Sequence, residues 1–201
     1  MTRFNLPTIP GELFWKNQPL DWKIGTDNSL TITAGEKTDW FCDPAKKILL
    51  NNAPSSLFVP PDNKFFLRAK VSVDFLSDYD AGAIQIFESD KLWAKLCFEY
   101  SPQRQPMIVS VVTRVTSDDC SSVVIEGNEV YLRITQTPEA TAFHYSLDGT
   151  YWQFVRYFSL GELENLRVGF STQSPTGTQC TAVFSKISYQ AGKLKDKRSG
   201  E

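Results

Sequence analysis

The chain has 201 residues, of which 41% are hydrophobic and 22% are charged, a composition typical of a globular protein with a sizeable core. Its formal net charge is -2 at pH 7 and no sustained basic stripe runs along it, which argues against nucleic acid or a membrane surface as the partner. No linker rich in Pro, Gly and Ser divides the chain, so we expect a single domain over residues 1–191. Residues 192–201, whose basic side chains are interleaved with Asp196, predict a polar and flexible C-terminal tail.

Alternation of apolar and polar residues predicts β-strands along most of the chain. In chain order, the segments with clear alternation are 65–75, 83–89, 92–100, 130–135, 143–147 and 166–171. Residues suited to tight turns lie at 77–80, 88–91, 126–128, 148–149 and 174–177. Helical signals are confined to single turns at 44–50 and 161–165, so the pattern predicts an all-β jelly-roll sandwich of two antiparallel sheets.

The segment Leu92–Tyr100 has the most informative pattern. In an extended strand Trp93, Lys95, Cys97 and Glu99 point to one face, and the apolar residues between them point to the other. A strand that hides an apolar row and presents an indole, an ammonium and a carboxylate is typical of a sheet with a recognition surface.

Cysteine usage and the N-terminus both favour a cytoplasmic protein. The first residues contain no apolar segment of the signal-peptide kind, and no apolar run is long enough to cross a bilayer. The widely spaced cysteines predict free, mostly buried thiols rather than a disulfide scaffold, and they are Cys42, Cys97, Cys120 and Cys180. We expect no metal and no cofactor, because there is no zinc spacing and the paired turn acids do not assemble the oxygen ligands that Ca²⁺ requires.

An ordered series of short motifs runs through most of the domain. The motifs are Phe14-Trp15, Trp22, Lys37-Thr38-Asp39-Trp40, Tyr79-Asp80-Ala81-Gly82, Trp93-Ala94-Lys95, Glu99-Tyr100, Ser110-Val111-Val112-Thr113, Ser117-Asp118 and Tyr145-Ser146-Leu147-Asp148-Gly149. In order and spacing they resemble the DUF1349 family, also labelled regulation-of-enolase proteins. The resemblance implies a concanavalin A-like lectin/glucanase sandwich, in agreement with the strand pattern, and it suggests a link to carbohydrate metabolism.

The residues that carry this resemblance combine flat apolar faces with hydrogen-bonding charges, which recognition of a sugar ring needs. We therefore expect a sugar or sugar phosphate on the concave sheet, with an indole stacked on the ring, carboxylates accepting hydrogen bonds and cations donating them. The expected ligand-binding residues are Lys37, Asp39, Trp40, Asp80, Trp93, Lys95, Glu99, Arg133 and Tyr145. Arg133 and Tyr145 join this surface only if their sheet neighbours the Trp93 strand.

A structural interpretation stays open beside this hypothesis. Trp residues in β-sandwiches more often pack in the core or at its rim, as we expect for Trp15, Trp22 and Trp152. Lys95 and Glu99 can likewise form an ion pair that only stabilises the sheet. Two further functional hypotheses are a protein-interaction module that regulates a metabolic enzyme such as enolase, and a sugar hydrolase or isomerase.

Catalysis has less support in the sequence than binding. Hydrolysis of a glycoside needs two carboxyl groups roughly 5 to 9 Å apart, but the acidic i, i+2 pairs of this chain fall in expected turns. Glu99 is the one catalytic candidate, and Asp80 or Asp39 is its partner only if folding brings them together. His144, the single histidine, alternates with aromatic residues as a surface strand position does, which argues against a catalytic triad.

Overall fold

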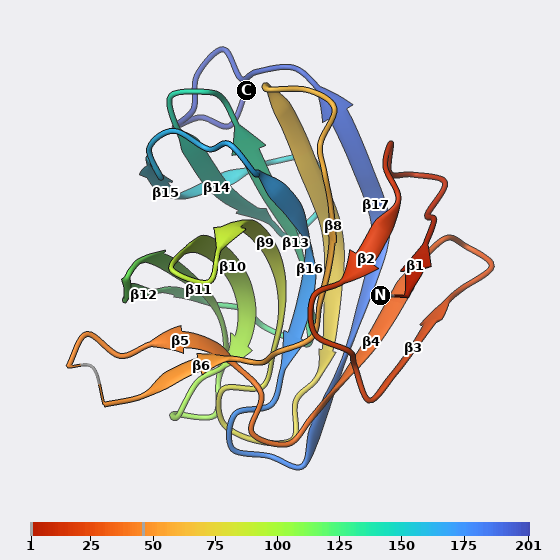
Figure 1. The fold of residues 1–201 in the computed structure, drawn as a ribbon, viewed down its shortest axis with the longest axis vertical. Helices are drawn as coiled ribbons and strands as arrows, with labels where there is room; N and C mark the ends of the chain where they lie inside the picture. The colour runs from red at the N-terminus through yellow and green to blue at the C-terminus, as the bar shows by residue number, and fades with distance from the viewer. Residues whose placement is uncertain (1, 46) are drawn as a thin grey trace.

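The structure, a computed structural model, describes residues 2–45 and 47–201. It consists of strands and loops, and no helix occurs in the part of the chain that it describes. An eight-stranded sheet and a seven-stranded sheet pack face to face around one core, and a two-stranded hairpin lies beside them (Figure 1). The predicted class, an all-β sandwich of two antiparallel sheets, is confirmed.

The strands keep the numbers shown in Figure 1. The eight-stranded sheet has the order β1 (Arg3–Phe4), β2 (Leu13–Trp15), β7 (Ser55–Phe58), β16 (Arg167–Gln173), β9 (Ala81–Ser89), β10 (Leu92–Tyr100), β11 (Pro106–Arg114) and β12 (Thr116–Val124). The seven-stranded sheet has the order β15 (Gln153–Phe158), β14 (Thr141–Ser146), β13 (Glu129–Gln136), β8 (Phe65–Asp74), β17 (Gln179–Ala191), β4 (Leu30–Gly35) and β3 (Asp21–Ile24). The hairpin pairs β5 (Trp40–Cys42) with β6 (Leu49–Asn51).

The core lies between the two large sheets because each strand turns its apolar positions inward. Leu67 and Val71 of β8 face Ile84 of β9 and Leu96 and Phe98 of β10, and all five are fully buried. Burial of each such side chain contributes about 1.5 to 3 kcal/mol to folding. The period-two pattern that predicted β8, β9 and β10 is therefore the pattern of core contacts.

Two local expectations differ from the structure, and one strand lies outside the segments with clear alternation. The helical turn at 44–50 is not formed, because Leu49–Asn51 pairs with β5, and Lys46 lies outside the described residues. The turn at 161–165 is an irregular loop. Strand β12 has no clear apolar alternation, because it is an edge strand that pairs only with β11 and leaves most of its side chains exposed.

Residues 192–201 follow β17 and lie against the outer face of the seven-stranded sheet, near β14 and β15 (Figure 1). Leu194 and Gly200 are buried there. The predicted boundary at residue 191 coincides with the end of β17, and the flexibility of the tail stays a prediction.

Gly82 gives a test of how closely the sheets pack. It lies on the core face of β9, where an added Cβ would come 2.7 Å from Val71 Cγ1 and 2.9 Å from Ala182 Cβ. We expect Gly82→Ala to lower the free energy of unfolding by about 1 to 3 kcal/mol, because overpacking a dense core forces its neighbours to shift. Gly35→Ala is the control, since its Cβ would meet nothing within 4 Å. Equal effects of the two changes in urea denaturation would contradict this packing.

Candidate functional site

The outer face of the eight-stranded sheet, on the side away from the core, carries the alternate side chains of β10. Trp93, Lys95, Cys97 and Glu99 point to this face, as the sequence predicted. The curved strands β9 to β11 open toward the side where the β5–β6 hairpin lies, so the hairpin crosses the concavity (Figure 1).

Both tryptophans that we expected to stack on a sugar are buried where the hairpin meets the sheet, and Trp40 belongs to the hairpin itself. Trp40 Nε1 donates to Ala53 O and to Ser55 Oγ, each at 3.0 Å. Its ring lies edge-on to Trp93, with ring centroids 5.8 Å apart, and both side chains have no exposed surface. The prediction of an indole platform is therefore wrong, because Trp40 of the hairpin packs on Trp93 of the sheet and neither ring is exposed.

Lys95 anchors the hairpin to the sheet. Its Nζ donates to Asp39 Oδ1 at 2.9 Å and to Gln173 Oε1 at 2.7 Å. The Lys95 side chain is 3% exposed and that of Asp39 is 14% exposed. Burial opposes the charge on Lys95, but nearby negative charge, chiefly that of Asp39, more than offsets it and raises the pKa of the ammonium. This is a buried ion pair of the kind that the structural interpretation anticipated, with Asp39 rather than Glu99 as the partner.

Glu99 is half-buried on the same face. Loss of solvent raises the pKa of Glu99 to about 8 against the opposing effect of Lys95, and the negative charges of Asp39 and Asp119 add to the rise. This environment therefore favours the neutral form of Glu99 over the carboxylate. Among the described residues no hydrogen bond or ion pair uses its carboxyl group, so a proton donor faces the concave side.

Two nominated residues of the N-terminal half lie away from this cluster. Lys37 is exposed in the turn before the hairpin. Asp80 is fully buried and accepts hydrogen bonds from Ser77 N at 2.8 Å and Ser174 Oγ at 2.8 Å, so its carboxylate fixes a turn and is closed to a ligand. It is not a partner for Glu99.

The condition placed on Arg133 and Tyr145 is not met. β13 and β14 belong to the seven-stranded sheet, so neither residue shares a face with Trp93. Tyr145 packs against the core, whereas Arg133 lies on the opposite outer face of the sandwich beneath residues 192–201. The surface position predicted for His144 is also wrong. Residues 192–201 cover His144, and it is fully buried.

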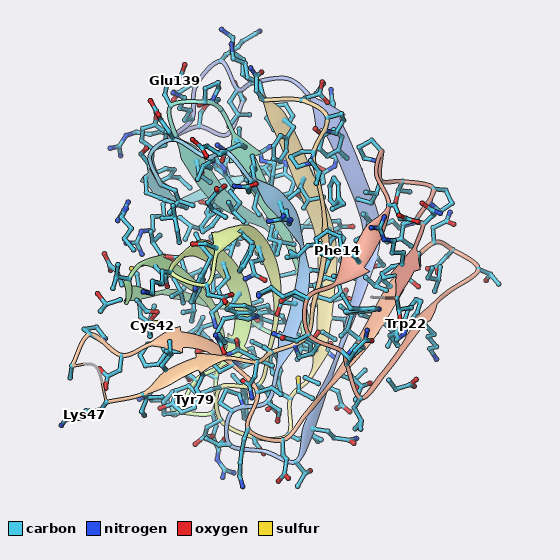
Figure 2. The ribbon with its side chains drawn as sticks, in the orientation of Figure 1. Phe14, Trp22, Cys42, Lys47, Tyr79 and Glu139 are labelled. Atoms are coloured by element: carbon cyan, nitrogen blue, oxygen red, sulfur yellow. The ribbon has the colours of Figure 1, made fainter. Side chains whose placement is uncertain are left out.

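A groove of about 630 Å³ remains open on the outer face of the eight-stranded sheet. Phe14, Leu57 and Phe87 form its apolar part, and Phe14 lies toward the N-terminal edge of the sheet, far from Cys42 of the hairpin (Figure 2). Trp40 packs edge-on against Phe87 at 5.6 Å and separates this groove from the Lys95 pair.

The rim of the groove is charged. Arg3 pairs with Glu12 at 2.7 Å, and Lys16 pairs with Asp90 at 2.8 Å. The guanidinium of Arg167 lies 5.8 Å from the ring centre of Phe14, and among the described residues it forms no ion pair. Sequence reasoning missed this site, because its residues come from β1, β2, β7, β9 and β16, whose adjacency only strand pairing reveals.

A smaller hollow of about 490 Å³ separates the hairpin from β12. Phe41 and Pro44 line one side of it, and Ser117, Asp118 and Asp119 line the other. Within the described residues no three His, Cys, Asp or Glu side chains gather as a metal site would require.

A family profile described as "Protein of unknown function (DUF1349)" matches residues 15–192. The chain belongs to the DUF1349 family. The resemblance drawn from the motifs is therefore confirmed. A comparison with curated proteins gave no match, and among the described residues no helix is long and apolar enough to cross a membrane.

Solved structures of similar fold include a functionally unknown protein from Saccharomyces cerevisiae, with a TM-score of 0.79, 23% identity, and coverage of 90% of this chain and 96% of that one. The GH43 protein BlXynB from Bacillus licheniformis gives a TM-score of 0.70 and 16% identity over 87% of this chain, which matches 36% of the BlXynB chain. The carbohydrate-binding module CBM66 from Bacillus subtilis gives a TM-score of 0.55 and 10% identity, over 88% of this chain and 95% of the module. At these identities the likeness shows a shared β-sandwich fold.

The Lys95–Asp39 pair predicts a large stability loss on substitution. Lys95→Met leaves the negative charge of Asp39 buried without a partner, so we expect the free energy of unfolding at pH 7 to fall by about 3 to 5 kcal/mol. Lys70→Met is the matched control, because the Lys70–Glu129 pair is solvent-exposed and worth less than about 1 kcal/mol. Similar losses in both variants by chemical denaturation would contradict this account.

The raised pKa of Glu99 predicts that the stability of the protein depends on pH. The pKa of Glu99 rises from its ordinary 4.5 to about 8 in the folded protein, so stability falls as pH rises through this range, because only the unfolded chain releases the proton. Glu99→Gln removes the effect. The stability of the variant relative to wild type should therefore increase between pH 5 and pH 8, by about 3.5 kcal/mol.

Glu139→Gln serves as the control for Glu99→Gln. Glu139 is exposed at the opposite end of the molecule from the hairpin (Figure 2). A lowered pKa keeps Glu139 ionised over the whole range, so its variant should track wild type. Parallel pH profiles for Glu99→Gln and wild type in thermal unfolding would show that Glu99 is ionised at neutral pH.

Proposed function

We propose that this protein binds a carbohydrate in the open groove on the outer face of the eight-stranded sheet. The observation that carries the proposal is the position of Phe14 in the floor of the groove, with the Arg167 guanidinium beside its ring. A sugar needs an apolar surface for its C–H face and charged groups for its hydroxyls. The groove supplies both within one cavity of about 630 Å³, inside the range of about 300 to 1,000 Å³ typical of small-ligand sites.

The charges of the rim favour a sugar that carries an acidic substituent. Glu12 holds Arg3, and Asp90 holds Lys16, but Arg167 donates only to the backbone oxygen of Asn165, at 3.2 Å. A guanidinium presents a planar fork of donors that matches a carboxylate or a phosphate. We therefore propose an acidic sugar or a sugar phosphate, with its ring on Phe14 and its anionic group on Arg167.

The fold supports this choice of ligand class. The CBM66 structure is titled a carbohydrate-binding module, and BlXynB is titled a GH43 protein. A β-sandwich also serves many other functions, so the proposal depends on the groove. The unpaired state of all four cysteines fits a reducing compartment such as the cytoplasm.

Calorimetric titration with neutral and acidic oligosaccharides and sugar phosphates tests the proposal. We expect saturable binding of at least one acidic saccharide, and Phe14→Ala should weaken it at least tenfold by removing the ring surface. Arg167→Gln should weaken the acidic ligand at least tenfold and its neutral counterpart much less. Arg104→Gln, an exposed loop arginine away from the groove, is the control.

Two results would overturn the groove as the site. The first is a bound saccharide whose affinity is unchanged by both Phe14→Ala and Arg167→Gln. The second is a failure of every saccharide to bind the folded protein, which would favour the alternative of a protein-interaction module acting on a metabolic enzyme such as enolase.

A further inference from the structure

Arg133 is a buried cation without an acidic partner. It lies on β13 at the outer face of the seven-stranded sheet, and only 6% of it is exposed. Its Nη2 donates to Gly200 O at 2.8 Å, and its guanidinium carbon lies 4.2 Å from the centre of the Trp152 ring. No ion pair within the described residues includes Arg133.

Such a placement is costly, because a buried charge is normally balanced by an opposite charge. Arg68, the register partner of Arg133 on β8, adds a like charge. Burial and Arg68 lower the pKa of Arg133 to about 10, so its guanidinium is still charged at neutral pH. The backbone oxygen of Gly200 and the Trp152 ring offset only part of this cost.

The polar groups around Arg133 are also incompletely bonded. Arg133 Nε, Thr135 Oγ1 and His144 Nδ1 are buried and have no hydrogen-bond partner within the described residues. His144 is the register partner of Arg133 on β14. Its Nε2 lies 2.7 Å from Lys197 O, and a carbonyl oxygen only accepts, so Nε2 carries the proton. Donors on two adjacent strands thus converge on one place.

The segment 194–201 supplies the acceptors at present. Two of its backbone oxygens, on Lys197 and Gly200, accept from His144 and Arg133. Its charged side chains stay near the surface, where Lys197 Nζ donates to Tyr157 OH at 2.8 Å and Arg198 lies 5.3 Å from the ring centre of Phe154. Two neutral carbonyl groups therefore occupy the positions that the oxygens of an anion would take.

We propose that Arg133, His144 and Thr135 form a binding site for a phosphate group, which residues 194–201 cover until the ligand displaces them. Positive charge favours a phosphate over a neutral ligand, because Arg133 and Arg68 stay in the sheet when the segment leaves. In the displaced state Arg133 and His144 donate to phosphate oxygens in place of the two carbonyl oxygens. The site lies in the other sheet from the sugar groove and does not depend on it.

His144 provides a direct reporter, because it is the only histidine of the chain. Burial and the charge of Arg133 lower the pKa of His144 to about 4. Arg133 in the sheet is the charged group that acts on it, and the covering segment faces it with the backbone oxygen of Lys197. Titration of inorganic phosphate at constant ionic strength should give a saturable change in the His144 ring signals by NMR and raise its pKa by at least one unit. Acetate and chloride at equal ionic strength should do neither.

Substitution of Gly200 tests whether residues 194–201 cover the proposed phosphate site. A Cβ on Gly200 would come 2.9 Å from both Arg133 Nη2 and Trp152 Cβ, so Gly200→Ala should dislodge the segment and tighten phosphate binding at least threefold. Gly161→Ala is the matched control, because both glycines have φ +80° but a Cβ on Gly161 would meet nothing within 4 Å. Arg133→Met should abolish the phosphate response.

Two outcomes would overturn the proposal. One is the absence of a saturable His144 response to phosphate in both wild type and Gly200→Ala, which would leave Arg133 as a clamp for the segment. The other is an unchanged phosphate response in folded Arg133→Met. If Arg133→Met does not fold, the comparison of Gly200→Ala with Gly161→Ala still decides, because equal phosphate affinities in the two would contradict a covered site.

Discussion

The ion pair between Lys95 and Asp39 is the interaction on which the outer face of the eight-stranded sheet depends. It ties the hairpin to the middle of the sheet, over a face that carries Trp93. Once the hairpin is held there, Trp40 seals Trp93 from solvent and forms a boundary of the open groove. A single buried charge pair thus converts an exposed aromatic surface into packing and leaves the ligand-sized space beside it.

Lys95 and Arg133, the buried cations in the part of the chain that the structure describes, differ in how their charge is balanced. Lys95 has a carboxylate and an amide oxygen as partners, so its burial is explained by the structure alone. Arg133 has a carbonyl oxygen and an aromatic ring, which leave its charge uncompensated. Because uncompensated burial is costly, Lys95 is understood as a structural residue, whereas Arg133 is the centre of the proposed phosphate site. Sequence reasoning placed both in a single site.

The shared fold depends on the arrangement of the strands, whereas the proposed sites depend on individual side chains. Solved β-sandwiches align with most of this chain at 10% to 23% identity, which shows the arrangement of the strands. The groove beside Phe14 and the covered cluster at Arg133 depend instead on particular side chains. Function therefore has to be argued from these sites, since one sandwich supports many kinds of recognition.

The sequence by itself determined the class of fold and the facing of individual strands. The alternation in Leu92–Tyr100 correctly placed Lys95 and Glu99 on one face, because side-chain direction in a strand follows from position alone. Only the tertiary structure decided which faces meet, which strands share a sheet and which segments cover them. Arg133 lies in the other sheet, and His144 is buried by residues distant in sequence. Strand pairing and coverage are non-local, so no local pattern encodes them.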